Sequence, residues 1–209
     1  LHVRSRRQRQ MCIRDRTWFV PHDVDGLVEL MGGRDAFIGK LDSLFTADSK
    51  LEGESTSVDI SGLIGQYAHG NEPSHHIAHL YNYVGQPWRT QEIVDEVLHT
   101  LYFNNPDGLS GNEDCGQMSA WYILNAMGFY QVCPGKPVYS IGRPLFNEAT
   151  VHLKDGKSFK VIAHNNSRDN KYVRSIVLNG NKLETPFFTH QDIVDGGTLE
   201  LTMGSEPLK

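Results

Sequence analysis

Long hydrophobic runs are absent from this sequence of 209 residues, so no segment is expected to span a membrane as a helix. Cysteine is scarce, with three residues in all, and this number excludes both a disulfide framework and a cysteine-rich zinc site. Internal repeats and low-complexity tracts are also absent. Hydrophobic residues make up 39% of the chain, which is enough for one globular domain or two small ones with a real core.

Positive charge is scarce outside the first sixteen residues, LHVRSRRQRQMCIRDR. This head contains six arginines and one acidic residue, a local charge of +5, whereas the whole chain has a net charge of -5. The remainder therefore carries a charge of -10. Because so acidic a body would repel a polyanion, we expect no nucleic-acid partner.

The basic head could serve as a targeting peptide or an RNA-binding arm, but we favour neither. Its last six residues, MCIRDR, resemble one reading frame of a transposon-end adapter used to prepare DNA for sequencing. We therefore expect residues 1–16 to be an artefact and the native sequence to begin at Thr17. Without Cys12 the chain retains Cys115 and Cys133, which could form one bridge in an exported protein or remain two buried thiols.

Helical periodicity dominates residues 17–129. The expected helices cover five stretches: Asp23–Gly33, Arg34–Phe45, Ser74–Val84, Thr90–Phe103 and Gln117–Met127. Helices joined by long polar loops suggest an α-helical barrel or bundle whose loops carry the functional site.

Particular residues are expected to begin and end these helices. The expected N-caps are Asp23, Ser74 and Thr90, because serine, threonine and aspartate are favoured at that position. Gly128 is expected to stop the fifth helix. Trp121 lies among apolar neighbours in that helix and is expected in the core.

Beyond about residue 137 the pattern changes to alternating polar and apolar residues. The stretches ATVHLKDGKSFKVIAHN and VRSIVLNGNKL each place a two-residue turn, Asp155-Gly156 or Asn179-Gly180, between two strand-like runs. The stretch GGTLELTMG supplies a last strand. The expected fold class is therefore α+β, with a helical part at 17–140 that carries the site loops and a small antiparallel β subdomain at 141–209.

Three polar stretches lie where loops meet helices: FVPHD at 19–23, HGNEPSHH at 69–76 and GNEDCGQ at 111–117. In the third stretch, Asp114 could be the N-cap of the fifth helix. N-capping does not explain the neighbouring Asn112 and Glu113, because a helix end accepts a single Ncap side chain. These oxygen-bearing side chains therefore mark a candidate functional loop.

The histidines after the second loop raise a metal hypothesis, since His75 and His79 lie four residues apart on an expected helix. A zinc hydrolase of the familiar type would have glutamate as its base where His76 stands. We therefore favour histidines that are hydrogen-bonded in a helix interface. Hard oxygen ligands suit calcium better than zinc. The residues that could supply them are Asn71, Glu72, Asn112, Glu113 and Asp114.

Three long stretches are recognisable together: WFVPHDVDGLVELMGGRDAFIGKLDSLF, GNEPSHHIAHLYNYVGQPWRTQ and GNEDCGQMSAWYILNAMGFYQVCPG. They resemble glycoside hydrolase family 92, the calcium-dependent exo-acting α-mannosidases of bacteria and some fungi, and the resemblance runs from Thr17 to the C-terminus. It implies an N-terminal β-sandwich domain followed by an (α/α)6-type helical barrel domain. This chain would be the C-terminal portion of that barrel, followed by the small antiparallel sheet.

Members of this family invert the anomeric configuration, which requires a carboxylic acid and a carboxylate base on opposite faces of the sugar. The resemblance assigns the general base to Asp114 and a base-assisting role to Asn112, where many members have aspartate. The general acid is expected just before WFVPHD, where this chain has no glutamate. Glu72 is the fallback acid. Without the usual acid and the sandwich domain, we expect the chain as written to be inactive.

The resemblance also implies Ca²⁺ as a cofactor that holds the O2 and O3 hydroxyls of mannose and distorts its ring. Its expected ligands are Asn71, Glu72, Asn112 and Asp114. The expected substrates are glycans with terminal α-linked mannose, α-1,2-linked by preference, such as N-glycans or mannan. Substrate contacts are expected from His75, His76, Trp88, Glu113 and Gln117. A periplasmic or secreted location is expected for the family.

Other readings fit the same residues. One is a helical-barrel glycosidase that acts on another sugar, such as rhamnose or glucose, which calcium dependence would distinguish. Another is a non-catalytic carbohydrate-binding domain that uses Trp88, Trp121 and Tyr122 as stacking platforms. The last is a truncated chain that never exists as a folded protein, because it would expose a domain interface.

Overall fold

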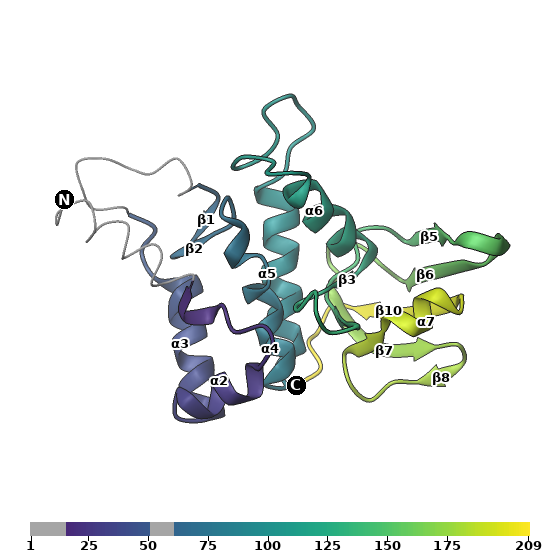
Figure 1. Cartoon of the computed structure of the whole chain (residues 1–209), viewed down its shortest axis with the longest axis horizontal. Helices are drawn as coiled ribbons and strands as arrows, with labels where there is room; N and C mark the ends of the chain where they lie inside the picture. Colours follow the sequence, from purple (N-terminus) through teal and green to yellow (C-terminus); the bar gives the residue numbers. More distant parts are fainter. Residues whose placement is uncertain (1–15, 51–60) are drawn as a thin grey trace. The chain divides into compact units, whose positions relative to one another are not determined.

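The computed structural model describes residues 16–50 and 61–209, and Figure 1 labels most of their helices and strands. The expected artefact at 1–16 lies outside these residues except for Arg16. The described residues divide into two compact units. The first contains the residues up to Ile77 together with Leu101–Ser119, and the second contains Ala78–Thr100 together with Ala120–Lys209.

Helices of the predicted kind open the first unit. Its regular elements are α2 (Val24–Leu30), α3 (Arg34–Thr46), β1 (Leu63–Ile64), β2 (Tyr67–Ala68) and the 3-10 turn η1 (Glu72–Ser74). The Asp23 carboxylate accepts a hydrogen bond from Gly26 N at 3.0 Å, so Asp23 caps α2 as predicted. Trp18 meets the buried face of α3 through an edge-to-face contact with Phe37, with ring centroids 5.3 Å apart.

The helix predicted for Ser74–Val84 is wrong. The chain instead forms η1, a second 3-10 turn η2 (Ile77–His79) and the short helix α4 (Leu80–Tyr83). Ser74 is buried at the end of η1, so it is not the N-cap of a helix. The physical reason is tertiary, because the rings of His75 and His76 bond to backbone carbonyls of other segments. These contacts outweigh a helical pattern that is only a weak preference.

The longer helices of the second unit largely follow the prediction. They are α5 (Pro87–Thr100), α6 (Gln117–Met127), which begins in the first unit, and the short α7 (His190–Val194). Thr90 is not the N-cap, because α5 already begins at Pro87. Proline suits the start of a helix, since an N–H group in the first turn would have no partner within the helix. Trp88 therefore lies in a helix and is half-buried. Gly128, with a φ of 102°, ends α6, and Trp121 is fully buried as predicted. Among the described residues, no helix is both long and apolar enough to cross a membrane.

Strands of the second unit form two sheets. Across the larger sheet lie β5 (Glu148–His152), β6 (Ser158–His164), β10 (Gly197–Gly204), β7 (Tyr172–Leu178) and β8 (Asn181–Lys182), and across the smaller lie β3 (Phe129–Tyr130), β4 (Val138–Ile141) and β9 (Phe187–Thr189). The turns at Asp155-Gly156, within the 3-10 turn η3 (Lys154–Gly156), and at Asn179-Gly180 lie where predicted, with positive φ at each residue. The prediction of an antiparallel sheet is wrong for one pair, because β10 enters between β6 and β7 and runs parallel to β6. The division between residues 140 and 141 stays a prediction.

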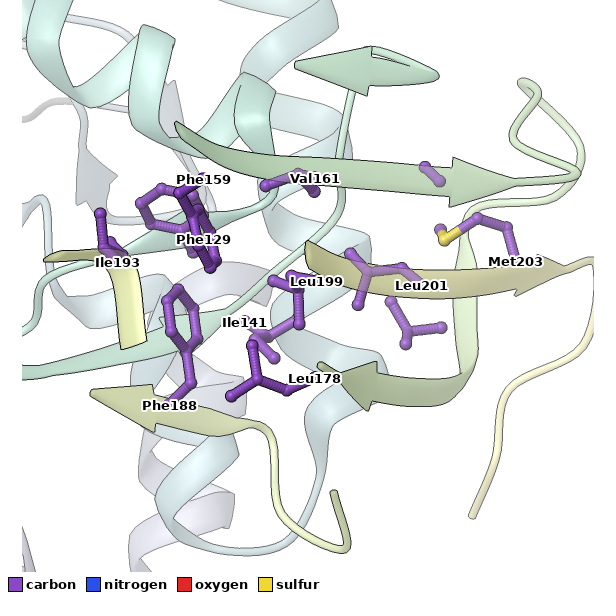
Figure 2. Packing of buried hydrophobic residues seen from close by; sticks show 12 residues of the cluster. Phe129, Ile141, Phe159, Val161, Leu178, Phe188, Ile193, Leu199, Leu201 and Met203 are labelled. Atoms are coloured by element: carbon purple, nitrogen blue, oxygen red, sulfur yellow. The ribbon is translucent and has the colours of Figure 1, made fainter. Parts of the chain in front are cut away.

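The core of the second unit lies along the central strand β10. Leu199, Leu201 and Met203 alternate along this strand and are buried. Figure 2 shows them in one cluster with side chains from neighbouring strands, including Phe159 and Phe188. The rings of Phe159 and Phe188 stack with centroids 5.8 Å apart. The alternation read from GGTLELTMG therefore reflects burial of every second side chain.

Candidate active site

The second and third polar stretches meet in space within the first unit. A Cβ atom on Gly111 would lie 2.7 Å from the Cα atom of Gly70, and one on Gly70 would lie 2.8 Å from the carbonyl oxygen of Ser110. The two loop backbones touch there because neither glycine carries a side chain. The structure thus joins residues 69–76 to residues 111–117, a contact that the sequence left open.

The acidic loop, residues 111–117 at the start of α6, has a strained backbone. Asp114, Cys115 and Gly116 follow one another with φ angles of 42°, 60° and 87°, so three successive residues are left-handed. Residues other than glycine remain in this region only when their surroundings hold them, and such strain gathers at functional sites. Asp114 is exposed, as is Asn112, so both side chains are accessible to solvent or a ligand.

Glu113 has a structural role in the same loop. Its carboxylate oxygens accept hydrogen bonds from Ser119 N at 3.0 Å and from Ser119 Oγ at 2.8 Å. Backbone N–H groups of a first helical turn lack partners within the helix, and a negative charge near them is favourable. The acidic residue that caps α6 is therefore Glu113 rather than Asp114.

His75, His76 and His79 are all buried and hydrogen-bonded, and His79 joins η2 to α6 through its Nε2 atom, 2.8 Å from Asn125 Oδ1. His75 Nε2 lies 2.9 Å from the carbonyl oxygen of His69, and His76 Nε2 lies 2.7 Å from that of Trp18. His79 belongs to the second unit, so it does not share a helical face with His75. In the described part of the chain, no three histidine, cysteine, aspartate or glutamate side chains form a group suited to a metal ion.

Sequence reasoning missed His69, which lies at the centre of a buried polar cluster. Tyr67 Oη lies 2.8 Å from its Nδ1 and Tyr102 Oη lies 2.7 Å from its Nε2. The rings of His69 and His75 stack with centroids 4.8 Å apart. Gln117 Nε2 lies 3.1 Å from His75 Nδ1, so the cluster reaches the first residue of α6. The only signal in the sequence was the position of this histidine directly before GNEP, residues 70–73, in the loop at 69–76 that we call the GNEP loop.

The folded state should lose stability as the pH falls from 7 to 5. Burial lowers the pKa of His75 from its usual 6.5 to about 4, and it also lowers the pKa of His69 and of His76. Below about pH 6.5 the unfolded chain therefore binds more protons than the folded chain, so stability present at pH 7 is lost as the pH decreases. For His75 this loss is about 2 kcal/mol at pH 5.

Urea unfolding at pH 7 and pH 5 checks this expectation. His75→Gln should reduce the difference between the two midpoints, because the substituted side chain does not titrate. His152→Gln, at an exposed position on β5, should leave the difference unchanged. The same pH dependence in the parent protein and in His75→Gln would show that burial of this histidine does not control acid stability.

Trp88, Trp121 and Cys133 lie outside the two loops in the sequence, whereas Cys115 belongs to the second of them. Trp88 belongs to the second unit. Cys115 is exposed and Cys133 is half-buried, and both are free thiols. The reading of two buried thiols is therefore wrong for Cys115. Trp121 has no exposed surface, so it cannot serve as a stacking platform for a sugar.

Known proteins similar to this chain are glycosidases. The model of the glycosyl hydrolase family 92 catalytic domain matches residues 12–205. A curated relative, an uncharacterized secreted glycosidase of Arthroderma benhamiae, is 32% identical over 192 residues. These residues are 90% of this chain and 23% of that relative.

Solved structures of family 92 enzymes share the fold. An α-mannosidase of Bacteroides thetaiotaomicron is 43% identical, with a TM-score of 0.82 over 91% of this chain and 24% of that one, and its mannoimidazole complex gives 0.85. An inverting mannosidase of the same organism is 44% identical, with a TM-score of 0.78 over 91% of this chain and 27% of that one. The similarity confirms a mixed helix-and-sheet fold in a chain that spans about a quarter of these relatives. The chain therefore belongs to glycoside hydrolase family 92.

Proposed function

We propose that this chain is part of an inverting, exo-acting α-mannosidase that hydrolyses terminal α-linked mannose, with α-1,2 linkages favoured. The observation that carries the proposal is the exposed Asp114 on a left-handed turn, in a loop that touches the GNEP loop, in a member of family 92. The mannosidase activities and the mannoimidazole complex of the relatives support mannose as the sugar. In the longer enzyme this chain would complete an (α/α)6-type barrel that follows a β-sandwich domain.

Asp114 is the proposed general base. Inversion requires a carboxylate that removes a proton from water as the water oxygen attacks the anomeric carbon, while a carboxylic acid protonates the leaving oxygen. The Asp114 side chain is exposed, whereas Glu113 is engaged in capping α6. Asn112 could orient the water through its amide oxygen, but an amide cannot accept the proton at neutral pH.

The general acid is proposed to come from a glutamate just before WFVPHD in the longer enzyme. Residues 1–16 contain no glutamate, so a protein made of the present residues alone is expected to be inactive. Glu72 is the second candidate for this role. Its side chain is half-buried in the loop that touches the acidic loop.

Calcium is the proposed cofactor, and the two touching loops carry oxygen donors of the type that suits it. Asn71 and Glu72 lie on one loop, and Asn112 and Asp114 lie on the other. Their carboxylate and amide oxygens are of the kind that Ca²⁺ prefers. The nearby histidines bond to backbone carbonyls, which makes a zinc site a poorer fit. A bound Ca²⁺ ion would act as a Lewis acid and as a template for the O2 and O3 hydroxyls of mannose.

N-glycans or mannan are the proposed source of the substrate, and a secreted or periplasmic location is proposed because the Arthroderma benhamiae relative is described as secreted. Roles in substrate binding are proposed for His75, His76, Glu113 and Gln117, while the role predicted for Trp88, which belongs to the second unit, stays a prediction. Since His75 and His76 are buried, they would act by holding the loops in shape. Gln117 is half-buried at the start of α6, directly after the acidic loop.

Mannose release from α-1,2-mannobiose by the full-length enzyme tests the proposal. We expect release that a chelator abolishes and that added Ca²⁺, but not Mg²⁺, restores. Release that survives chelation would remove calcium from the mechanism and retain the mannosidase. No release by a folded enzyme would favour another linkage or sugar, or a domain that binds carbohydrate without hydrolysing it.

A further inference from the structure

A chain of hydrogen bonds crosses the first unit from Tyr67 to the backbone of α6. Tyr102 Oη donates to the carbonyl oxygen of Met118 at 3.1 Å. Because a hydroxyl has one proton, Tyr102 must accept the bond of 2.7 Å from His69, whose Nε2 is therefore protonated. The Nδ1 atom of neutral His69 then accepts from Tyr67 Oη at 2.8 Å. The direction of every bond in the chain follows from the carbonyl at its end.

A second chain of hydrogen bonds reaches the same helix through His75. Its Nε2 atom faces the carbonyl oxygen of His69 at 2.9 Å, and since a carbonyl can only accept, this nitrogen carries the proton. His75 Nδ1 therefore accepts from Gln117 Nε2 at 3.1 Å. Each ring thus uses one nitrogen as a donor and the other as an acceptor, as a neutral imidazole does. Both chains end on the first two residues of α6, Gln117 and Met118.

These two residues directly follow the strained turn that carries Asp114. Backbone hydrogen bonds hold the turn only loosely, because Gln117 N lies 3.3 Å from the carbonyl oxygen of Asp114 and Met118 N lies 3.3 Å from that of Glu113. Both distances exceed the usual range for N–H···O bonds. Side-chain bonds add restraint, from Glu113 to Ser119 across the turn and from Tyr102 and His75 to the first two residues of α6.

We propose that His69, Tyr102, His75 and Gln117 are positioning residues that hold Asp114 where it can accept a proton from the attacking water. The inference rests on the proposed function, since it takes Asp114 as the base. None of the four needs to touch the reacting atoms, because they act through the first turn of α6. A displacement of about 1 Å at a reacting group can lower a rate about a hundredfold, so a small shift of this turn is sufficient.

Two matched tyrosine variants of the full-length enzyme test the proposal. Tyr102→Phe removes the hydroxyl that joins His69 to α6, and it should lower kcat for α-1,2-mannobiose about tenfold or more, with KM nearly unchanged. Tyr67→Phe removes the hydroxyl at the other end of the chain, which does not reach α6, and should lower kcat less than about threefold. Equal losses of kcat in the two variants, or no loss in Tyr102→Phe, would overturn the proposal.

A spectroscopic measurement keeps the proposal testable if a variant does not fold or if the parent enzyme does not cleave mannobiose. Ring ¹⁵N chemical shifts of the folded parent enzyme should show His69 and His75 both protonated at Nε2. Protonation at Nδ1 in either ring would contradict the assigned directions and overturn the proposal. The expected tautomers in an enzyme that releases no mannose would instead count against the proposed function, so the two failures are distinguishable.

Discussion

Replacing Asp114 with asparagine in the full-length enzyme should lower kcat about a thousandfold, within the range that general bases contribute. Asparagine has the same size and tolerates the left-handed backbone, where φ is 42°, so the loop should keep its shape. Its amide cannot accept the proton of the attacking water. The loss should be equally large for α-1,2-mannobiose and for an activated aryl α-mannoside, because a good leaving group removes only the need for an acid.

The matched control is Asp107→Asn, which removes another exposed carboxylate in the same unit and should leave kcat unchanged. Azide, a nucleophile that needs no base, should partly restore turnover of the aryl mannoside by Asp114→Asn and yield the β-mannosyl azide. If Asp114→Asn retains more than a tenth of the parent activity, Asp114 is not the base.

The second large effect is expected at the contact between the two loops. Gly111→Ala should lower kcat/KM about a hundredfold, because the new Cβ atom would lie 2.7 Å from Gly70 Cα and 2.8 Å from Gly70 O. Both neighbours are backbone atoms, so the loops themselves have to move apart. The φ angle of Gly111 is not positive, so alanine introduces no backbone strain of its own. The movement would separate the proposed calcium donors of the two loops.

Kinetics and thermal unfolding of Gly111→Ala should be compared with those of Gly39→Ala. Gly39 lies inside α3, and a Cβ atom there meets nothing within 4 Å. Gly39→Ala should keep full activity and stabilise the fold by about 0.5–1 kcal/mol, because alanine restricts the unfolded chain and favours the helix. Gly111→Ala with more than half of the parent activity would show that the close contact is not required.

Elements with local signals were the most predictable parts of the fold. Asp23 caps α2 and Gly128 ends α6, and the turn at Asn179-Gly180 lies between the expected strands. Each signal acts within a few residues of the structure that it specifies. The helix predicted for Ser74–Val84 was wrong because the buried rings of His75 and His76 bond to the carbonyls of His69 and Trp18. A pattern of apolar spacing contains no information about such partners. The parallel pairing of β6 and β10 is equally a property of long-range topology.

The sequence identified the two polar stretches of the candidate site, but it did not predict their contact or the hydrogen bonds within them. Both polar stretches were identified from their oxygen-bearing residues, but their contact depends on two glycines that lie far apart in the sequence, Gly70 and Gly111. Glu113 and Asp114 are equally plausible caps by residue type, and only the bonds to Ser119 distinguish them. His69 was missed because its partners come from residues on either side of the GNEP loop.

The left-handed turn at residues 114–116 has a consequence for how this enzyme can change by mutation. At a φ angle of 42°, glycine, asparagine and aspartate are the side chains that the backbone accepts most readily. Glutamate, the other carboxylate in the genetic code, lacks the short side chain that makes this conformation tolerable. Lengthening the proposed base to reach a differently placed sugar is therefore the least accessible route to new specificity. Adaptation to other glycans would then proceed through changes in the surrounding loops, and a designer who transplants the proposed base would have to transplant the turn with it.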